Sequence, residues 1–267
     1  AASDVYKRQV QVASVQTLVR RMERLAWRPD LIVIDEAHHA VAGSWRKVID
    51  HYSGARLLGV TATPARLDGR GLGDVFDDLV SGPTISELTA HGFLTTTKIY
   101  APPTNVDLSR IAVRAGDFAK EQLSAAMDKP TITGDAIGHY RRICPGASAI
   151  AFCVSVDHAR HVAAQFRESG FRAASLDGSM SDAERAGLID DLGSGRINVL
   201  TSCDIVSEGT DIPTVHSAIL LRPTQSESLY LQQVGRVLRP APGKEHAVIL
   251  DHVGNVLRHG MPDDERD

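Results

Sequence analysis

A short apolar run that ends in two acidic residues most constrains how this chain can fold. Residues 31–34 are an unbroken aliphatic stretch (Leu-Ile-Val-Ile), and Asp35 and Glu36 follow it directly. Four such residues in a row predict a strand that is buried on both faces, as in a parallel sheet. Ligands of open α/β sheets bind outside the carboxyl ends of the strands, so the acidic pair lies at a candidate ligand site.

The two carboxylates suit the hydrolysis of a nucleoside triphosphate. Asp35 could hold Mg²⁺ through water, because Mg²⁺ keeps several of its waters and takes only one or two protein carboxylates. Glu36 could orient and deprotonate the water that attacks a γ-phosphate. For a bare Asp-Glu pair, however, the simpler interpretation is a solvated acidic strand end.

Small polar residues flank this strand on both sides in the sequence. Thr61 and Thr63 follow a second predicted strand and could link the acidic pair to a neighbouring site, although Thr and Pro are also common in ordinary turns. Upstream, Ser14, Gln16 and Thr17 could donate hydrogen bonds to phosphate oxygens without reading bases. The alternative is that Ser14 caps a helix over 15–25.

Two arginines near the end of the chain are candidates for a phosphate clamp. Arg236 and Arg239 are three residues apart, so on a helix they would project from one side. Guanidinium groups bind phosphate oxygens through paired hydrogen bonds, which suits such a pair. A solvated basic face is the alternative.

The spacing of apolar residues predicts a fold of the α/β class. Alternating strands and helices of this length indicate βαβ units and a mostly parallel sheet, and 267 residues suffice for two lobes with separate cores. Strands are predicted over 9–13, 31–34, 55–60, 148–153, 173–176, 197–201, 215–221 and 246–250. Helices are predicted over 15–25, 118–127, 132–143, 156–168, 182–192 and 226–238.

Four segments, in their order along the chain, resemble the motifs of superfamily 2 helicases. The Asp-Glu-Ala-His segment 35–38 resembles motif II of the DEAH type (Walker B), and the Thr-Ala-Thr segment 61–63 resembles motif III. Residues 207–213 (Ser-Glu-Gly-Thr-Asp-Ile-Pro) resemble motif V, and residues 232–239 fit the motif VI pattern Gln-x-x-Gly-Arg-x-x-Arg. The style of these motifs is similar to bacterial and phage DNA helicases of the type III restriction motor group.

This resemblance implies two RecA-like parallel-sheet lobes in tandem, the first incomplete. The first lobe would occupy residues 1–95 with motifs Ib, II and III. A connector would follow over 96–130, and the second lobe would span 131–267 with motifs IV, V and VI. The protein would then be an ATP-dependent DNA helicase or translocase that uses ATP and Mg²⁺, and catalysis would require the two lobes to close on the nucleotide.

The resemblance also assigns roles to individual residues, with Arg239 as the arginine finger and Arg236 as its supporting contact. Where many relatives carry a phosphate-touching Thr, this chain has Cys203, so Thr201 and Ser202 nearby are the candidates for that contact. Arg222, just after a predicted strand, either adds a phosphate contact or lies in a surface loop. The full assignment is catalysis at Asp35, Glu36, Gln232, Arg236 and Arg239, coupling at His38, Thr61 and Thr63, ATP binding at Gly209 and Asp211, Mg²⁺ at Asp35, and nucleic-acid contacts at Ser14, Gln16, Thr17, Ser155, Thr201 and Arg222.

One expected element is absent from the sequence. It contains no G-x-x-x-x-G-K-[ST] phosphate-binding loop, and the segment Pro-Gly-Lys-Glu at 242–245 ends in Glu. We therefore expect the chain to be an N-terminally truncated fragment that hydrolyses ATP poorly or not at all, while its parent is an ATPase. The alternatives are the motor subunit of a restriction-type assembly and a non-catalytic nucleic-acid-binding module.

The amino-acid composition limits the kinds of partner that the protein can bind. Lys and Arg number 29 against 33 Asp and Glu, a net charge of −4, so any nucleic-acid site must be a local basic surface. The expected partner is DNA rather than RNA. Three cysteines without C-x-x-C spacing argue against a disulfide framework. The sequence shows neither a signal peptide nor an apolar run of membrane-spanning length, which predicts a cytoplasmic protein without a membrane partner.

Overall fold

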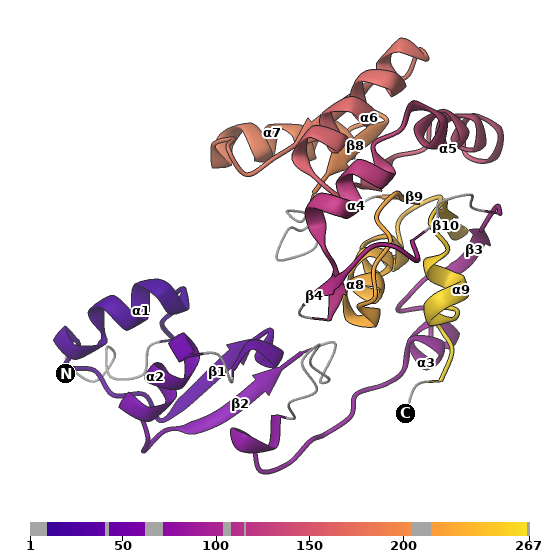
Figure 1. Cartoon of the computed structure of the whole chain (residues 1–267). Coiled ribbons are helices and arrows are strands. Elements are labelled where there is room, and N and C mark those ends of the chain that lie inside the picture. The colour runs from indigo at the N-terminus through magenta and orange to yellow at the C-terminus, as the bar shows by residue number, and fades with distance from the viewer. Residues whose placement is uncertain are drawn as a thin grey trace. The chain divides into compact units, whose positions relative to one another are not determined.

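The computed structural model describes residues 10–40, 43–61, 72–103, 108–114, 116–203 and 215–265. The chain divides into two compact units, Ala1–Ser81 and Gly82–Asp267. Figure 1 draws the first unit in indigo and violet and most of the second in magenta to yellow. Each unit is described by itself.

The first unit contains a pair of parallel strands beside short helices. Strand β1 (Leu31–Asp35) pairs in parallel with β2 (Arg56–Val60), so that Asp35 lies opposite Val60. The helical elements in the described part of this unit are α1 (Val15–Arg21), α2 (Gly43–His51) and three short 3₁₀ turns, Met22–Arg24, Ala37–His39 and Leu72–Asp74.

This small sheet is covered on one face. Ile34 is buried, and it packs in a cluster with Ala37 and Ala40. Successive side chains of a strand point to opposite faces, and on the other face Leu31 and Val33 are 51% and 57% exposed. Leu58 and Val60 of the neighbouring strand are exposed to the same degree. The prediction that the 31–34 strand is buried on both faces is therefore wrong for this structure.

The second unit is built on a six-stranded parallel sheet with the order β3-β10-β9-β6-β8-β7. The predicted α/β class with parallel sheets is confirmed. The strands are β3 (Thr96–Tyr100), β6 (Ala149–Phe152), β7 (Ala173–Leu176), β8 (Val199–Ser202), β9 (Ser217–Leu220) and β10 (His246–Asp251). The helices are α3 (Ile85–Ala90), α4 (Lys120–Met127), α5 (Pro130–Ile143), α6 (Val156–Glu168), α7 (Asp182–Gly193), α8 (Glu227–Leu238) and α9 (Asn255–His259), and β4 (Val113–Arg114) and β5 (Asp117–Phe118) form a short antiparallel pair.

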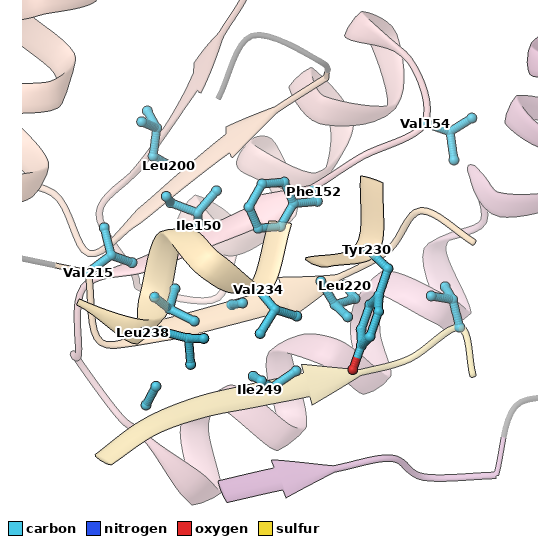
Figure 2. Close-up of a cluster of buried hydrophobic side chains, with 14 of the residues drawn as sticks. Ile150, Phe152, Val154, Leu200, Val215, Leu220, Tyr230, Val234, Leu238 and Ile249 are labelled. Atoms are coloured by element: carbon cyan, nitrogen blue, oxygen red, sulfur yellow. The ribbon is translucent and has the colours of Figure 1, made fainter. Parts of the chain in front are cut away.

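The central strands β6, β8 and β9 are buried on both faces, and alternate strand residues supply the two cores. On one face Ile150 and Leu220 pack with side chains of α8, as Figure 2 shows. On the other face Ala151 and Ile219 pack with side chains of α5 and α6. A strand whose residues are all apolar thus finds partners on both sides here, as expected for a parallel sheet.

The segment 96–130, predicted as a connector between lobes, is more structured than that. Its first five residues form β3, which pairs with β10 at the edge of the second unit's sheet. The division between the compact units falls at Ser81–Gly82, and the predicted bounds of the lobes stay a prediction. The pairing of β3 could not be predicted, because its partner lies at the far end of the chain, where no local pattern indicates it.

Within the described part of the chain, no helix combines the length and apolar character needed to cross a membrane.

Candidate functional site

The acidic pair lies at a sharp turn that ends β1. Glu36 adopts a left-handed backbone conformation with φ 51° and ψ 50°. Residues other than glycine rarely adopt this conformation, and such strain occurs preferentially at functional sites. The Glu36 amide donates to Oδ1 of Asp35 at 3.0 Å, which braces the turn. The exposed Asp35 carboxylate therefore stands at the carboxyl end of the strand, as predicted.

His38 connects the turn after β1 with the end of β2. Its Nδ1 lies 3.0 Å from the Thr61 hydroxyl and 3.4 Å from Oε2 of Glu36. The parallel register explains this meeting, because Asp35 is paired with Val60 and the next residues along both strands are therefore neighbours. An N–H at Nδ1 would serve both oxygens. The residues predicted to couple motif II to motif III are thus in contact, whereas Thr63 lies outside the described residues.

The acidic residue at the end of β1 is compatible with water-mediated Mg²⁺ binding. No group of three or more His, Cys, Asp or Glu side chains that could hold a metal ion occurs among the described residues. A single exposed carboxylate at a strand end nevertheless matches the way Mg²⁺ is held, with one or two protein carboxylates and several waters. Asp35 therefore fits the role that the sequence assigns to it, and that role remains a prediction.

The hydroxyl cluster upstream of β1 forms a helix cap. Ser14 precedes α1, accepts a hydrogen bond from the Thr17 amide at 3.3 Å and donates to the Thr17 hydroxyl at 2.9 Å. This is the alternative interpretation that the sequence left open. Ser14, Gln16 and Thr17 are all exposed, so their contact with a nucleic acid stays a prediction.

In the second unit, α8 presents Gln232 and Arg236 on one face. The two are four residues apart, so they are neighbours on the helix surface, and both are half-buried. Tyr230, Val234 and Leu238 occupy the opposite face, against the sheet (Figure 2). The helix begins after Ser226, whose hydroxyl accepts from the Leu229 amide at 3.1 Å.

Arg239 lies outside this helix, which corrects the prediction about the two arginines. The helix ends at Leu238, and Arg239 is extended, with φ −62° and ψ 132°. Pro240 follows, and a proline disfavours the helical conformation of the residue before it. Arg236 and Arg239 therefore do not project from one side of a helix. Arg239 is exposed at the point where the chain leaves α8.

Two of the predicted nucleic-acid contacts lie inside the second unit. Thr201 is fully buried, and its hydroxyl donates to the carbonyl of Ala159 at 2.7 Å. Arg222 is 13% exposed and lies 3.5 Å from the Asp117 carboxylate. Thr201 is thus a core residue, which corrects its predicted contact with a nucleic acid. Arg222 lies in the loop after β9 and pairs with Asp117, and its phosphate contact stays a prediction.

The remaining predicted contacts have structural partners or lie outside the described residues. Ser155 caps α6 by accepting from the His158 amide at 3.2 Å, and its hydroxyl lies 2.9 Å from that of Ser124. Cys203 is buried and donates to the carbonyl of Val154. Gly209 and Asp211, the predicted ATP contacts of motif V, fall in 204–214, outside the described residues.

Sequence reasoning missed Asp117, which holds the start of α8 in place. Its Oδ1 accepts from the Thr224 hydroxyl at 3.0 Å and from the Gln225 amide at 2.8 Å. These residues directly precede the Ser226 cap, so the carboxylate fixes the loop from which the helix starts. No sequence signal could have found this contact, because its partners are more than 100 residues apart in the chain.

Two family models match the chain in separate regions. Residues 2–66 match the type III restriction enzyme, res subunit, and residues 135–241 match the helicase conserved C-terminal domain. A 51.5 kDa protein of a Lactococcus phage is 36% identical over 97% of this chain and 56% of that protein. IRC3 of Saccharomyces cerevisiae, a provisionally assigned ATP-dependent helicase, is 33% identical over 94% of this chain and 38% of that protein. The chain thus spans about half or less of the length of these relatives.

Solved structures share the fold across most of the chain. A fragment of a provisionally assigned HsdR subunit of a type I restriction enzyme from Vibrio vulnificus has a TM-score of 0.67 at 24% identity, over 88% of this chain and 45% of that one. The type ISP restriction-modification enzyme LlaBIII, bound to DNA, has a TM-score of 0.63 at 18% identity, over 90% and 19%. S. cerevisiae Dbp5, bound to RNA and ADP BeF3, has a TM-score of 0.61 at 20% identity, over 94% and 61%. At these identities the likeness concerns the fold.

Proposed function

Because the chain belongs to the superfamily 2 helicases of the restriction-motor type, we propose that it is the motor part of a DNA helicase or translocase driven by ATP hydrolysis. The observation that carries the proposal is the contact of His38 with both Glu36 and Thr61. It joins a candidate general base at the end of one strand to the end of its neighbour. The activity belongs to the whole protein, of which this chain supplies a part.

In the proposed reaction, the first unit activates the attacking water. Glu36 would accept a proton from that water, and its strained backbone with the bond to Asp35 fixes where its carboxylate can point. Asp35 would hold Mg²⁺ through water. When bound, that ion supplies positive charge to the phosphate oxygens.

The second unit would stabilise negative charge on the transferring phosphoryl group. An arginine finger contributes on the order of 10³–10⁵ in rate. We assign that part to Arg239, which is exposed, and the supporting contacts to Gln232 and Arg236 on α8. Gly209 and Asp211 are proposed to contact ATP. Since Asp35 and Glu36 belong to one unit and the arginines to the other, turnover would depend on groups from both units.

We propose that the nucleic acid along which the protein moves is DNA. One matching family is a subunit of a type III restriction enzyme, and one structure that shares the fold was solved on DNA. Another was solved on RNA, so the test must compare both nucleic acids. Exposed Ser14, Gln16 and Thr17 at the start of α1 are the proposed contacts with the nucleic-acid backbone.

Phosphate release from ATP and Mg²⁺ tests this proposal. We would measure it with duplex DNA, single-stranded DNA, RNA or no nucleic acid, on this chain and on a form that also carries a phosphate-binding loop upstream. Glu36→Gln removes the proposed base, and Glu23→Gln, at an exposed position of the same unit, is the matched control.

DNA-stimulated turnover in the longer form, lost in Glu36→Gln and kept in Glu23→Gln, is the expected result. Turnover that is stimulated by RNA and not by DNA would show that the protein acts on RNA. Two results together would contradict the motor proposal: no turnover in any form, and an affinity for DNA that is the same with an ATP analogue and with ADP. The protein would then be a non-catalytic nucleic-acid-binding module.

A further inference from the structure

The chain reverses direction directly after Arg239. Pro242 and Gly243 form the centre of a tight turn in which the Lys244 amide donates to the carbonyl of Ala241 at 3.0 Å. Gly243 has φ 76°, which suits the third position of a type II turn, and proline is favoured at the second. The sequence Pro-Gly at 242–243 therefore returns the chain towards the end of α8.

This turn brings the Lys244 ammonium onto three backbone carbonyls. Its Nζ donates to Val237 at 2.5 Å, to Val215 at 2.7 Å and to Arg239 at 2.8 Å. A lysine ammonium has three N–H donors, so each of them has a carbonyl partner. Burial lowers the pKa of Lys244 to about 8, which is consistent with an ammonium held away from water.

Two of the three carbonyls belong to the motif VI segment, and the other belongs to Val215, which follows the predicted motif V. Val237 lies between Arg236 and Arg239, and the third carbonyl is that of Arg239 itself. Val215 follows Asp211 by four residues in the chain. One ammonium therefore joins Val215, two residues after the predicted motif V, to the end of motif VI.

We propose that Lys244 is a positioning residue that holds the backbone of Arg239 against that of Val215 and so sets where the Arg239 guanidinium can reach. The inference rests on the proposed function, because it concerns the reach of the proposed arginine finger. Arg239 lies beyond the last helical residue, so the hydrogen-bond ladder of α8 does not fix its backbone. The hydrogen bond from the Lys244 ammonium to the Arg239 carbonyl holds this backbone instead.

A plain helix cap is the competing explanation. Cations near a helix C-terminus stabilise it by interacting with the last carbonyls, whatever the helix carries. A cap alone would affect the stability of the unit, and it would leave turnover unchanged in protein that remains folded. A positioning residue would change turnover through Arg239.

The test compares two substitutions. Lys244→Met keeps an unbranched side chain of similar length and removes the N–H donors, whereas Lys244→Arg keeps the positive charge and the donors. Lys98→Met, at an exposed position of β3 in the same unit, is the matched control. Hydrogen exchange of residues 215–220 and 236–244 is measured first, on the chain itself. We expect faster exchange there in Lys244→Met, with α5 and α6 unchanged, and recovery in Lys244→Arg.

ATP turnover is measured next, in the form with the phosphate-binding loop. A misplacement of about 1 Å at a catalytic group can cost on the order of 10²-fold, so we expect Lys244→Met to lose roughly 10- to 100-fold in kcat. We expect KM to change by less than about twofold, as for an interaction made in the transition state. Combined with Arg239→Ala, the lysine substitution should cause no further loss, because it acts through that arginine.

Two results would overturn the proposal: unchanged exchange in Lys244→Met, or losses that multiply in the double variant. Should wild-type protein show no turnover, the proposed function falls. The exchange experiment then still decides whether Lys244 holds the backbone of Arg239.

Discussion

At the scale of single residues, Gly59 shows how closely the first unit packs around the acidic pair. A Cβ atom at this position would lie 2.5 Å from Cζ of Phe76 and 2.8 Å from Cβ of Ala37. Gly59 is paired with Ile34, one residue before the end of its strand. The glycine is thus required by close approach, and the contact supports the turn that carries Glu36.

We expect Gly59→Ala to lower the free energy of unfolding of the first unit by about 1–3 kcal/mol, the usual cost of overpacking a core. Both tryptophans, Trp27 and Trp45, belong to this unit, so their fluorescence during urea denaturation reports on it alone. Gly54→Ala is the control, because no heavy atom lies within 4 Å of its added Cβ. Equal midpoints for the two variants would contradict the packing argument.

The bond between His38 and Thr61 gives a second prediction. Thr61→Val keeps the shape of the side chain and removes the hydroxyl that lies 3.0 Å from Nδ1 of His38. A typical intramolecular hydrogen bond contributes about 1 kcal/mol, so a loss of that order is expected in the same fluorescence assay. Thr61→Ser keeps the hydroxyl and should retain most of the stability. Similar losses in both variants would show that the methyl group matters and the hydrogen bond does not.

Two buried histidines of the second unit make its stability depend on pH. Burial lowers the pKa of His158 and of His252 to about 4, below the unfolded value of 6.5. Between these pH values the unfolded chain binds more protons than the folded one. The stabilisation is therefore complete above pH 6.5 and is lost as the pH falls towards 4.

Each of these imidazoles should cost the second unit about 2 kcal/mol between pH 7 and pH 5. Circular dichroism during urea denaturation at the two pH values measures this loss. His252→Gln should reduce the dependence on pH, and His91→Gln, at an exposed position, should leave it unchanged. A wild-type stability that is equal at both pH values would refute the prediction.

The site could be predicted from the sequence where its groups are close in the chain or meet through strand register. Asp35, Glu36, His38 and Thr61 follow neighbouring parallel strands, so their proximity could be inferred. The position of Arg222 could not, because its partner Asp117 is separated from it by about a hundred residues. The burial of Thr201 could not be predicted either, because a threonine hydroxyl can donate to a backbone carbonyl in the core as well as to a phosphate at the surface.

At the scale of elements, local pattern predicted most of the second unit. The predicted helix over 156–168 and the predicted strand over 173–176 have those bounds in the structure. The predicted helix over 226–238 ends where α8 ends, before Pro240, and the error was to treat Arg239 as part of that helix. The covering of a strand is less predictable: β1 and β6 are similarly apolar, and only β6 is buried on both faces.

Two glycines of the second unit should respond to alanine with opposite signs. Gly138 lies inside α5 with open space around it, so Gly138→Ala should stabilise the unit by about 0.5–1 kcal/mol. Gly243 has φ 76° in its turn, where a Cβ costs roughly 1–2 kcal/mol, so Gly243→Ala should destabilise it. Chemical denaturation followed by circular dichroism gives both values. Shifts of the same sign would contradict the backbone argument.

At the scale of the whole molecule, burial is distributed unequally between the two units. The second unit buries both faces of the central strands of its six-stranded sheet. In the first unit, Leu31, Val33, Leu58 and Val60 remain about half exposed on one face of the sheet. Since buried apolar area is the main source of stability, the second unit should be the more stable of the two.

We expect residues 82–267, produced alone, to unfold in one cooperative transition near that of the second unit in the full chain. Residues 1–81 alone should melt at a lower temperature and with a broader transition. Circular dichroism melts of the two pieces and of the full chain provide the comparison. A stable first piece beside an unfolded second piece would reverse the assignment.

The edge strand β3 also has a consequence for biosynthesis. It is the first strand of its sheet to leave the ribosome, and its partner among the described strands, β10, is the last: Thr96 is paired with His246, 246 − 96 = 150 residues later. The strand must therefore wait, with its backbone groups unpaired, until translation of the unit is almost complete. Contacts this distant in sequence form slowly, and unpaired strand edges invite wrong partners. Pairing of β3 with β10 is thus a late step in the formation of this sheet, and we expect a chaperone that shields the nascent strand to raise the yield of folded protein.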